Sequence, residues 1–415
     1  MKGITRATAD FIRAHADDDV RQLALKGTKN PDIDLTFALD QIAGHQTARR
    51  KLPTWAASGG IVFPPHLSME QCSSEQTARY KAQLAQRVLK ATPHSLGSST
   101  LHSSPATLVD LTGGFGVDFS FMAQAFQKTV YVERQEHLCD IARHNFEVLG
   151  LKAEVVCGDS VDYLREMPHA SLIYLDPARR DNHGQRTYGI SDCTPDVVAL
   201  RALLLEKADV VIIKLSPMLD WRKAVSDLGE EYVREVHIIS VQNECKELLL
   251  VLSARSSGDA EPLLFCVNDA MVFTSHLITL ASDLRPQASS FFPLASQFLY
   301  EPNASIMKAG CFAEVAEVYG VSQLAPNSHL FVSDQIVADF PGRSFRVEAV
   351  TTMNKRELRT ALAGISQANI AVRNFPLSVA QLRQRLKLGE GGSTYVFATT
   401  LADKSHVLLI CRKTE

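Results

Sequence analysis

Between residues 107 and 252, short apolar runs alternate with stretches in which apolar residues recur at helical spacing. Phe119, Met122, Ala123 and Phe126 illustrate the second pattern, which gives a helix one apolar face. Seven apolar runs have the length of buried strands, and they span 108–111, 129–133, 154–157, 171–175, 209–214, 236–241 and 247–252. The alternation predicts an α/β fold in which helices separate the strands.

The first predicted strand runs into a glycine-dense turn, Thr112-Gly-Gly-Phe-Gly116, and a helix follows the turn. Glycine permits positive φ and close approach of a ligand to the main chain. The N–H groups that begin the helix point at whatever lies in the turn. Such turns also occur where a helix merely packs on a sheet. Glu133 favours a ligand-binding turn over a purely structural one. It ends the second strand, where nucleotide-binding folds place an acid that bonds ribose hydroxyls.

Polar groups also follow the third and fourth strands. Gly158-Asp159 comes directly after 154–157, and Asp176-Pro177-Ala178-Arg179 comes directly after 171–175. Open parallel sheets bind ligands at the carboxyl ends of their strands. We therefore expect the polar ends of four consecutive strands to meet in one crevice.

This order of motifs resembles the class I S-adenosylmethionine (SAM) methyltransferases, and more closely the bacterial methyltransferases that carry a C-terminal THUMP-like domain. The stretches that carry the closer resemblance are Leu67 to Glu75, Asp176 to Asp181, Asn243 to Leu248 and Glu301 to Gly310. The resemblance covers nearly the whole chain. It implies a Rossmann-like, seven-stranded class I methyltransferase sheet, with SAM as the methyl donor.

The resemblance also implies roles for residues at the donor site. Asp110, Thr112 and the three glycines would shape the pocket for the amino-acid end of SAM, Glu133 would hold the ribose, and Asp159 would bond the adenine amine. The full set of expected donor-binding residues is Ser74, Thr77, Asp110, Thr112, Gly113, Gly114, Gly116, Glu133, Asp159 and Ser160. The first two open a helix whose N-terminus suits the methionine carboxylate. Simple helix capping is the alternative for these two residues and for Asp159.

Asp176, Pro177 and Arg179 are the expected catalytic residues. In amino-methyltransferases of this class, a D/N-P-P-aromatic stretch accepts hydrogen bonds from the target amine. This chain has Asp-Pro-Ala-Arg, which lacks the second proline and the aromatic ring. Arg179 can instead stack on a base or bind phosphate. The alternative is an Asp-Pro turn without chemistry.

A chain of 415 residues exceeds one typical core, so several domains are expected. We predict a helical N-terminal region (1–95), a methyltransferase domain (96–255), a connecting segment (256–335) and a THUMP-like α+β domain (336–415). The last region follows a β-α-β-α-β-β order that is typical of ferredoxin-like folds. Its expected elements are 344–350, 355–364, 370–375, 378–388, 393–400 and 406–411.

From Phe340 onward the chain carries 12 Lys and Arg against 5 Asp and Glu, a balance of 12 − 5 = +7, although the whole chain has net charge −3. This asymmetry favours an anionic partner, and RNA is the expected one. The alternative is an ordinary solvated charged face. Aromatic residues are few in this region, so base stacking by it is not expected.

Several classes of protein are disfavoured. The eight cysteines include no CxxC pair, which favours reduced thiols in a cytoplasmic protein. No HExxH, GxxxxGK or GxSxG occurs, so a zinc, nucleoside-triphosphate or serine-hydrolase site is not expected, nor a metal site. No apolar run approaches the length of a membrane span, and no secretion signal follows Met1. Cys193 and Cys245 are expected to be packed thiols rather than nucleophiles.

The sequence thus predicts a SAM-dependent methyltransferase that modifies a base nitrogen of RNA, with the Arg179–Arg186 loop at the substrate. One alternative is a methyltransferase of a protein or a small molecule. Another is an RNA-binding protein whose SAM site is vestigial. A nicotinamide dehydrogenase is disfavoured, because Gly113-Gly-Phe-Gly116 lacks the G-x-G-x-x-G spacing.

Overall fold

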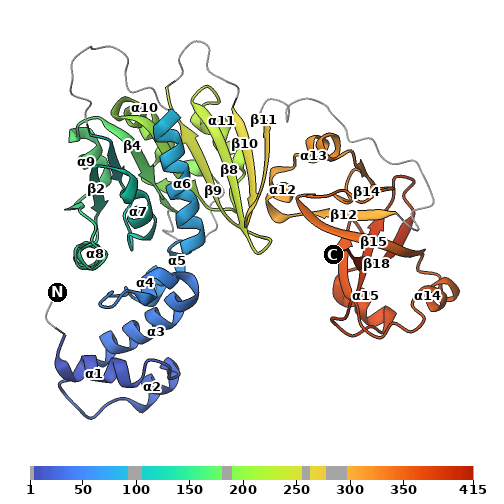
Figure 1. Cartoon of the computed structure of the whole chain (residues 1–415), viewed down its shortest axis with the longest axis horizontal. Coiled ribbons are helices and arrows are strands. Elements are labelled where there is room, and N and C mark those ends of the chain that lie inside the picture. Colours follow the sequence, from blue (N-terminus) through green and yellow to red (C-terminus); the bar gives the residue numbers. More distant parts are fainter. Residues whose placement is uncertain (1–3, 92–104, 180–188, 255–261, 277–296, 415) are drawn as a thin grey trace. The chain divides into compact units, whose positions relative to one another are not determined.

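The computed structural model describes residues 4–91, 105–179, 189–254, 262–276 and 297–414. The chain divides into two compact units. The first contains Met1–Arg234 and Leu249–Asp259, and the second contains Glu235–Leu248 and Ala260–Glu415. Figure 1 labels the helices and strands of both.

The first unit begins with six helices, which are α1 (Arg6–Ala14), α2 (Val20–Lys26), α3 (Leu35–Lys51), α4 (Pro53–Ala57), α5 (His66–Gln71) and α6 (Glu75–Ala91). Short polar side chains start the first three. Asp19 caps α2 by accepting the N–H groups of Arg21 and Gln22, a role for which aspartate is well suited. In Figure 1, α1 to α5 form one group, and α6 runs from this group along the sheet.

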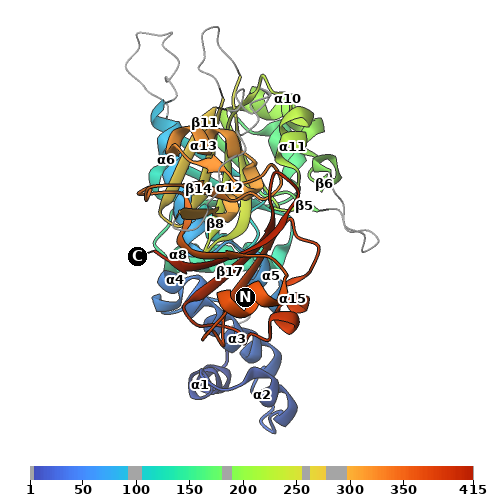
Figure 2. The same cartoon turned by 90° about the vertical axis from the view of Figure 1, so that its right-hand side faces the viewer.

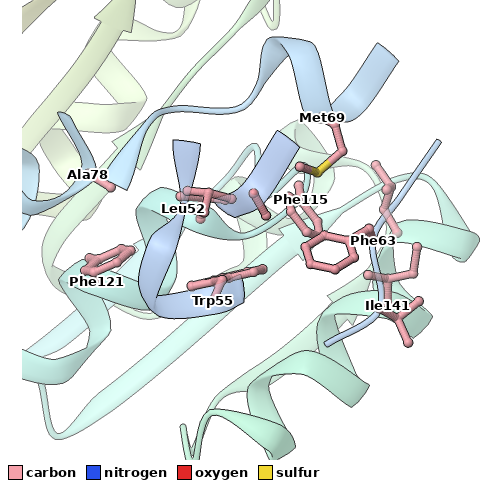
Figure 3. Close-up of a cluster of buried hydrophobic side chains, with 12 residues drawn as sticks. Leu52, Trp55, Phe63, Met69, Ala78, Phe115, Phe121 and Ile141 are labelled. Atoms are coloured by element: carbon pink, nitrogen blue, oxygen red, sulfur yellow. The ribbon is translucent and has the colours of Figure 1, made fainter. Parts of the chain in front are cut away.

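A cluster of buried apolar side chains joins these helices to the glycine turn (Figure 3). Trp55 of α4 packs edge-on against Phe115 of the turn, with ring centroids 4.9 Å apart. Phe121 follows the turn, and Met69 of α5 completes this side of the cluster. The N-terminal helices therefore share a core with the segment that shapes the predicted donor site.

The main sheet contains the seven predicted strands and two more. Its strands are β1 (Thr107–Asp110), β2 (Lys128–Glu133), β3 (Glu154–Cys157), β4 (Ala170–Leu175), β7 (Ala208–Leu215), β8 (Val233–Val241), β9 (Glu244–Leu252), β10 (Leu263–Asn268) and β11 (Met271–His276). Their order is β11-β10-β8-β9-β7-β4-β1-β2-β3. The strands β1 to β4 and β7 pair in parallel, so their carboxyl ends meet at one edge of the sheet.

Helices connect these strands as the periodicity predicts. They are α7 (Val117–Met122), α8 (Glu136–Val148), α9 (Ser160–Glu166), α10 (Val197–Lys207) and α11 (Trp221–Leu228), with short 3-10 turns η1 (Ala123–Ala125) and η2 (Ile190–Asp192). After β4, the chain forms a two-stranded ribbon of β5 (Ala178–Arg179) and β6 (Cys193–Thr194). This ribbon brackets residues 180–188 of the predicted substrate loop, which lie outside the described residues.

A tight turn at Gln242 and Asn243 joins β8 to β9. Both residues have positive φ (52° and 61°), which identifies the two-residue type I′ turn of an antiparallel hairpin. The Gln242 N–H donates to the Asp269 carboxylate beyond β10, and the Asn243 side chain accepts the N–H of Ala304. Both contacts lie within the second unit. The apolar residues within 263–273 would also suit a separate small sheet, but β10 pairs in parallel with β8 and so joins the main sheet.

The rest of the second unit is a seven-stranded sheet of order β13-β14-β12-β15-β18-β17-β16. Its elements are β12 (Phe298–Pro302), α12 (Ala304–Ala309), α13 (Phe312–Tyr319), β13 (Ser322–Gln323), β14 (Phe331–Ser333), β15 (Gly342–Thr351), α14 (Lys355–Ala361), β16 (Asn369–Arg373), α15 (Val379–Leu386), β17 (Thr394–Thr400) and β18 (His406–Lys413). The predicted β-α-β-α-β-β order is confirmed from β15 to β18.

Alternating side chains of β18 build a core on each face of this sheet. Leu408 and Ile410 belong to one cluster with Leu382 of α15, and Leu358 and Ala361 of α14 pack against the same cluster. Leu409 and Cys411 point the other way, into a cluster with Phe345 of β15. Figure 2 shows α15 beside the strand β17. Both helices therefore cover the same face, and their polar sides are turned to solvent.

Trp55→Ala should destabilise the first unit by about 3–5 kcal/mol, because it removes a buried ring from the cluster that joins α4 to the glycine turn. Thermal unfolding followed by circular dichroism would measure the loss. Leu25→Ala is the matched control, since Leu25 is 88% exposed and its loss should change stability by less than about 0.5 kcal/mol. Equal effects of the two substitutions would contradict the packing role of Trp55.

Candidate active site

Each glycine of the turn after β1 is required for a different reason. A Cβ on Gly113 would lie 2.1 Å from a ring carbon of Tyr131, so no side chain fits there. Gly114 has open space but a φ of +56°, which disfavours other residues. Gly116 combines a φ of +82° with the ring of Phe146 at 2.9 Å. The turn is therefore held tightly against the aromatic side chains beneath it.

Glu133 connects this turn to the end of β2. Its carboxylate is buried, and it accepts the N–H of Gly114 at 2.9 Å and the N–H of Gln135 at 2.8 Å. The sequence placed Glu133 beside the glycine turn, and the structure brings them into direct contact. The carboxylate thus fixes the turn in addition to the role predicted for it.

Asp110 and Thr112 link the turn to the predicted catalytic residue. Asp110 is buried and accepts the Thr112 N–H at 2.9 Å. The Thr112 hydroxyl in turn accepts the main-chain N–H of Asp176 at 2.6 Å. Burial raises the pKa of Asp110 well above its usual value, and the nearby charges of three other carboxylates act in the same direction. The ends of β1 and β4 are therefore joined at this point.

A chain of alternating charges lies beside Asp176. Lys81 of α6 forms an ion pair with Asp118 of α7 at 3.1 Å, and Lys214 at the end of β7 forms an ion pair with Asp176 at 2.5 Å. Lys214 also lies 4.0 Å from Asp118. Burial alone would raise the pKa of Asp118, but Lys81 and Lys214 outweigh it, and the pKa is lowered.

Two hydroxyl groups complete the environment of Asp118. The Tyr174 hydroxyl and the Ser73 hydroxyl each donate to its Oδ2 atom at 2.8 Å. The Ser73 oxygen also accepts a hydrogen bond from Lys81 at 2.9 Å. Asp118 is thus fixed from α6, from β4 and from β7.

Five residues of this network were not predicted from the sequence, and they are Ser73, Lys81, Asp118, Tyr174 and Lys214. Lys214 could have been found, because a charged residue that ends an apolar strand is the same signal that identified Glu133. Lys81 gave no signal, since a lysine on an amphipathic helix is ordinarily solvated.

The remaining predicted donor-binding residues lie on helix starts. Ser74 precedes α6 and accepts the N–H of Thr77 at 3.3 Å, and the Thr77 hydroxyl donates to the Ser74 carbonyl. Asp159 caps α9, with its Oδ1 atom accepting the N–H groups of Val161 and Asp162, and Ser160 is the first helical residue. Capping, the alternative for these positions, is therefore present in the structure.

The segment after Asp176 is described only in part. Pro177 is buried, and Arg179 pairs through its main chain with Cys193 in the β5–β6 ribbon. The side chain of Arg179 lies outside the described part, as do Arg180 and Arg186. Cys193 is buried, and burial raises the pKa of the half-buried Cys245 thiol, which disfavours a nucleophilic thiolate there.

These contacts gather four carboxylates, Asp110, Asp118, Glu133 and Asp176, around one glycine turn. Two of them, Asp118 and Asp176, have lysine partners. The carboxylates outnumber their lysine partners beside the glycine turn. This excess of negative charge suits a ligand with a positive centre, such as the sulfonium of SAM. The arrangement therefore fits SAM.

Comparison with known proteins gives the same class of enzyme. A protein of Porphyromonas gingivalis, crystallised as a candidate methyltransferase, shares 31% identity with this chain, and the match covers 99% of this chain and 98% of that one with a TM-score of 0.82. A SAM-dependent methyltransferase of Agrobacterium tumefaciens matches 44% of this chain and 62% of its own, with 15% identity and a TM-score of 0.31. The 16S rRNA methyltransferase of T. thermophilus, crystallised with AdoMet and guanosine, matches 46% of each chain, with 16% identity and a TM-score of 0.33.

Family models match two neighbouring segments in the C-terminal part of the chain. The THUMP domain-like family model matches residues 342–413, and a ferredoxin-like domain model matches residues 298–341. No curated protein matches the chain. Among the described residues, no helix combines the length and the apolar character that a membrane crossing needs.

The near-complete match to the P. gingivalis protein, together with the sheet and the glycine turn, shows that this chain belongs to the class I SAM-dependent methyltransferases that carry a C-terminal THUMP-like domain.

Proposed function

We propose that this methyltransferase transfers the methyl group of SAM to a nitrogen of an RNA base. The observation that carries the proposal is the direct link between Asp176 and the glycine turn, through the Thr112 hydroxyl at 2.6 Å. It supports an arrangement in which a hydrogen-bond acceptor for the target amine lies beside the donor.

We assign the donor-binding roles from this geometry. Asp110, Thr112 and the glycines would face the amino-acid end of SAM, and Glu133 would bond the ribose. The N-terminus of α6, with Ser74 and Thr77, would lie toward the methionine carboxylate, because helix N-termini favour anions. Asp159 uses Oδ1 for its cap, and we assign its Oδ2 atom, with Ser160 beside it, to the adenine amine.

The residues of the chain act mainly by orientation. When bound, SAM supplies a methyl group that its sulfonium has already activated. Asp176 accepts a hydrogen bond from the target amine and turns its lone pair toward the methyl group, with Pro177 fixing the main chain. Holding the two reactants in line can supply about 7–11 kcal/mol of the barrier. Arg179 would contact the base or a neighbouring phosphate.

Support for an RNA substrate comes from the charge on α14 and α15. Two C-terminal arginines, Arg343 and Arg373, bond Glu301 and are thus engaged within the protein. Five exposed cations remain on or directly after the two helices that cover one face of the sheet, and they are Lys355, Arg356, Arg359, Arg385 and Lys387. A cluster of cations on one surface suits a phosphate backbone.

The substrate class can be tested by methyl transfer from radiolabelled SAM into total RNA and into total protein. We expect label in RNA, and mass spectrometry of nucleosides from cells with and without the protein would identify the base. Asp176→Ala should reduce transfer by at least about a hundredfold while it spares SAM binding, because it removes a group that acts on the target amine. Label confined to protein or to small molecules would contradict an RNA substrate.

Glu133→Ala should weaken SAM binding by about 10- to 100-fold in calorimetry, since hydrogen bonds to a buried carboxylate contribute about 1.5–3 kcal/mol. Glu136→Ala is the matched control, because Glu136 is an exposed acid three residues further on. An unchanged affinity of the Glu133 variant would remove this residue from the donor site.

Binding of SAM should strengthen as the pH rises. Burial raises the pKa of Asp110 in the free protein, so a cationic donor must displace a proton, and its affinity falls as pH drops below that raised pKa. The slope should be at most about tenfold per pH unit. Asp110→Asn should flatten it. Calorimetry in buffers of different ionisation enthalpy would detect the released proton, and a pH-independent wild-type affinity would contradict this role.

A further inference from the structure

We propose that Lys214 is a positioning residue for methyl transfer, which holds the Asp176 carboxylate in its working orientation. This inference rests on the proposed function, in which Asp176 receives the target amine. It assigns a role to a residue at the end of β7, which no sequence motif identified.

The ion pair is close and lies at the boundary between core and solvent. The Lys214 Nζ atom is 2.5 Å from Asp176 Oδ2 and 4.0 Å from Asp118 Oδ2. The Lys214 side chain is 12% exposed, whereas that of Asp176 is 40% exposed. The pair therefore presents its carboxylate, and not its ammonium group, to the site.

The far side of Lys214 is anchored. Asp118 is 11% exposed and bonds Lys81, whose side chain is fully buried. The Ser73 and Tyr174 hydroxyls donate to the same carboxylate. Because Asp118 is fixed by three other groups, the ammonium of Lys214 has a fixed anion on one side and Asp176 on the other.

Asp176 is consequently held at two points. Thr112 accepts its main-chain N–H, and Lys214 donates to Oδ2. The Lys214 ammonium donates to Oδ2, and we assign the other oxygen, Oδ1, to the target amine. It also opposes the pull that a sulfonium exerts on a nearby carboxylate. Without Lys214, Asp176 would keep its main-chain anchor but would lose the orientation of its side chain.

The exposure of the four charged groups distinguishes this role from a purely structural one. Exposure rises along the chain from Lys81, through Asp118 and Lys214, to Asp176. An ion pair that contributed only to stability would be expected to have both of its charged groups buried and fully hydrogen-bonded. Here the last member is the predicted catalytic carboxylate, and it is the most exposed of the four.

Lys214→Met tests the proposal because it keeps the bulk of the side chain and removes its charge. At saturating SAM and total RNA, we expect kcat to fall by about 10- to 100-fold, because a small misplacement of a catalytic group lowers the rate by up to about that factor. The dissociation constant of SAM should stay within about threefold of the wild-type value. Lys214→Arg should restore much of the rate, since a guanidinium can again donate to Oδ2.

Lys223→Met is the matched control. Lys223 forms an ion pair with Asp227 on the exposed side of α11, and its loss should leave kcat, KM and the melting temperature near their wild-type values. An unchanged kcat in Lys214→Met would overturn the proposal. Loss of SAM binding and of folding in both Lys214 variants, with no rescue by arginine, would also overturn it in favour of a structural role.

The same experiment separates this inference from the proposed function. Wild-type enzyme is first assayed with labelled SAM on RNA and on protein, so the substrate class is known before the variants are compared. If wild type labels protein, the RNA proposal fails, and the effect of Lys214→Met on protein methylation still tests the positioning role.

Discussion

The buried carboxylate of Glu133 is the constraint on which the site depends. It accepts the N–H of Gly114 from the turn after β1 and the N–H of Gln135 at the start of the next helix. The parallel pairing of β1 with β2 brings these groups together, and the absence of a Cβ at Gly113 lets the turn lie against Tyr131. Tyr131 donates to the carbonyl of Gly114 from the same side. These contacts from β2 fix the glycine-rich turn on both sides of Gly114.

The second organising feature is the placement of charge in a poorly solvated region. A lysine as deeply buried as Lys81 is tolerated because it bonds Asp118 and Ser73. Such pairs add little net stability compared with apolar side chains of equal size, but breaking one partner is costly. Their value in this protein is geometric, because they join α6, α7 and the ends of β4 and β7 around a single carboxylate.

The sequence predicted what local patterns determine. The seven strands and the β-α-β-α-β-β order of the C-terminal region follow from periodicity, and both are confirmed. The placement of β10 in the main sheet could not be predicted. An apolar run of this length looks the same in the sequence whether the strand joins an existing sheet or forms a separate one. Lys81 was missed for a related reason. Its helix carries an ordinary amphipathic pattern, and only the fold brings Asp118 to it from far along the chain.

The parallel pairing of β10 with β8 has a consequence for any attempt to shorten the protein. Truncation at residue 255 would follow the boundary that motifs favour, but it would strip the hydrogen-bonding partner from β8 and leave an apolar strand as an open edge. Open edges of this kind recruit other chains and promote aggregation. It would also remove Asp269, which accepts the N–H of Gln242, and Ala304, which donates to Asn243. A fragment that keeps β8 paired must therefore extend at least through β10 and its partner β11.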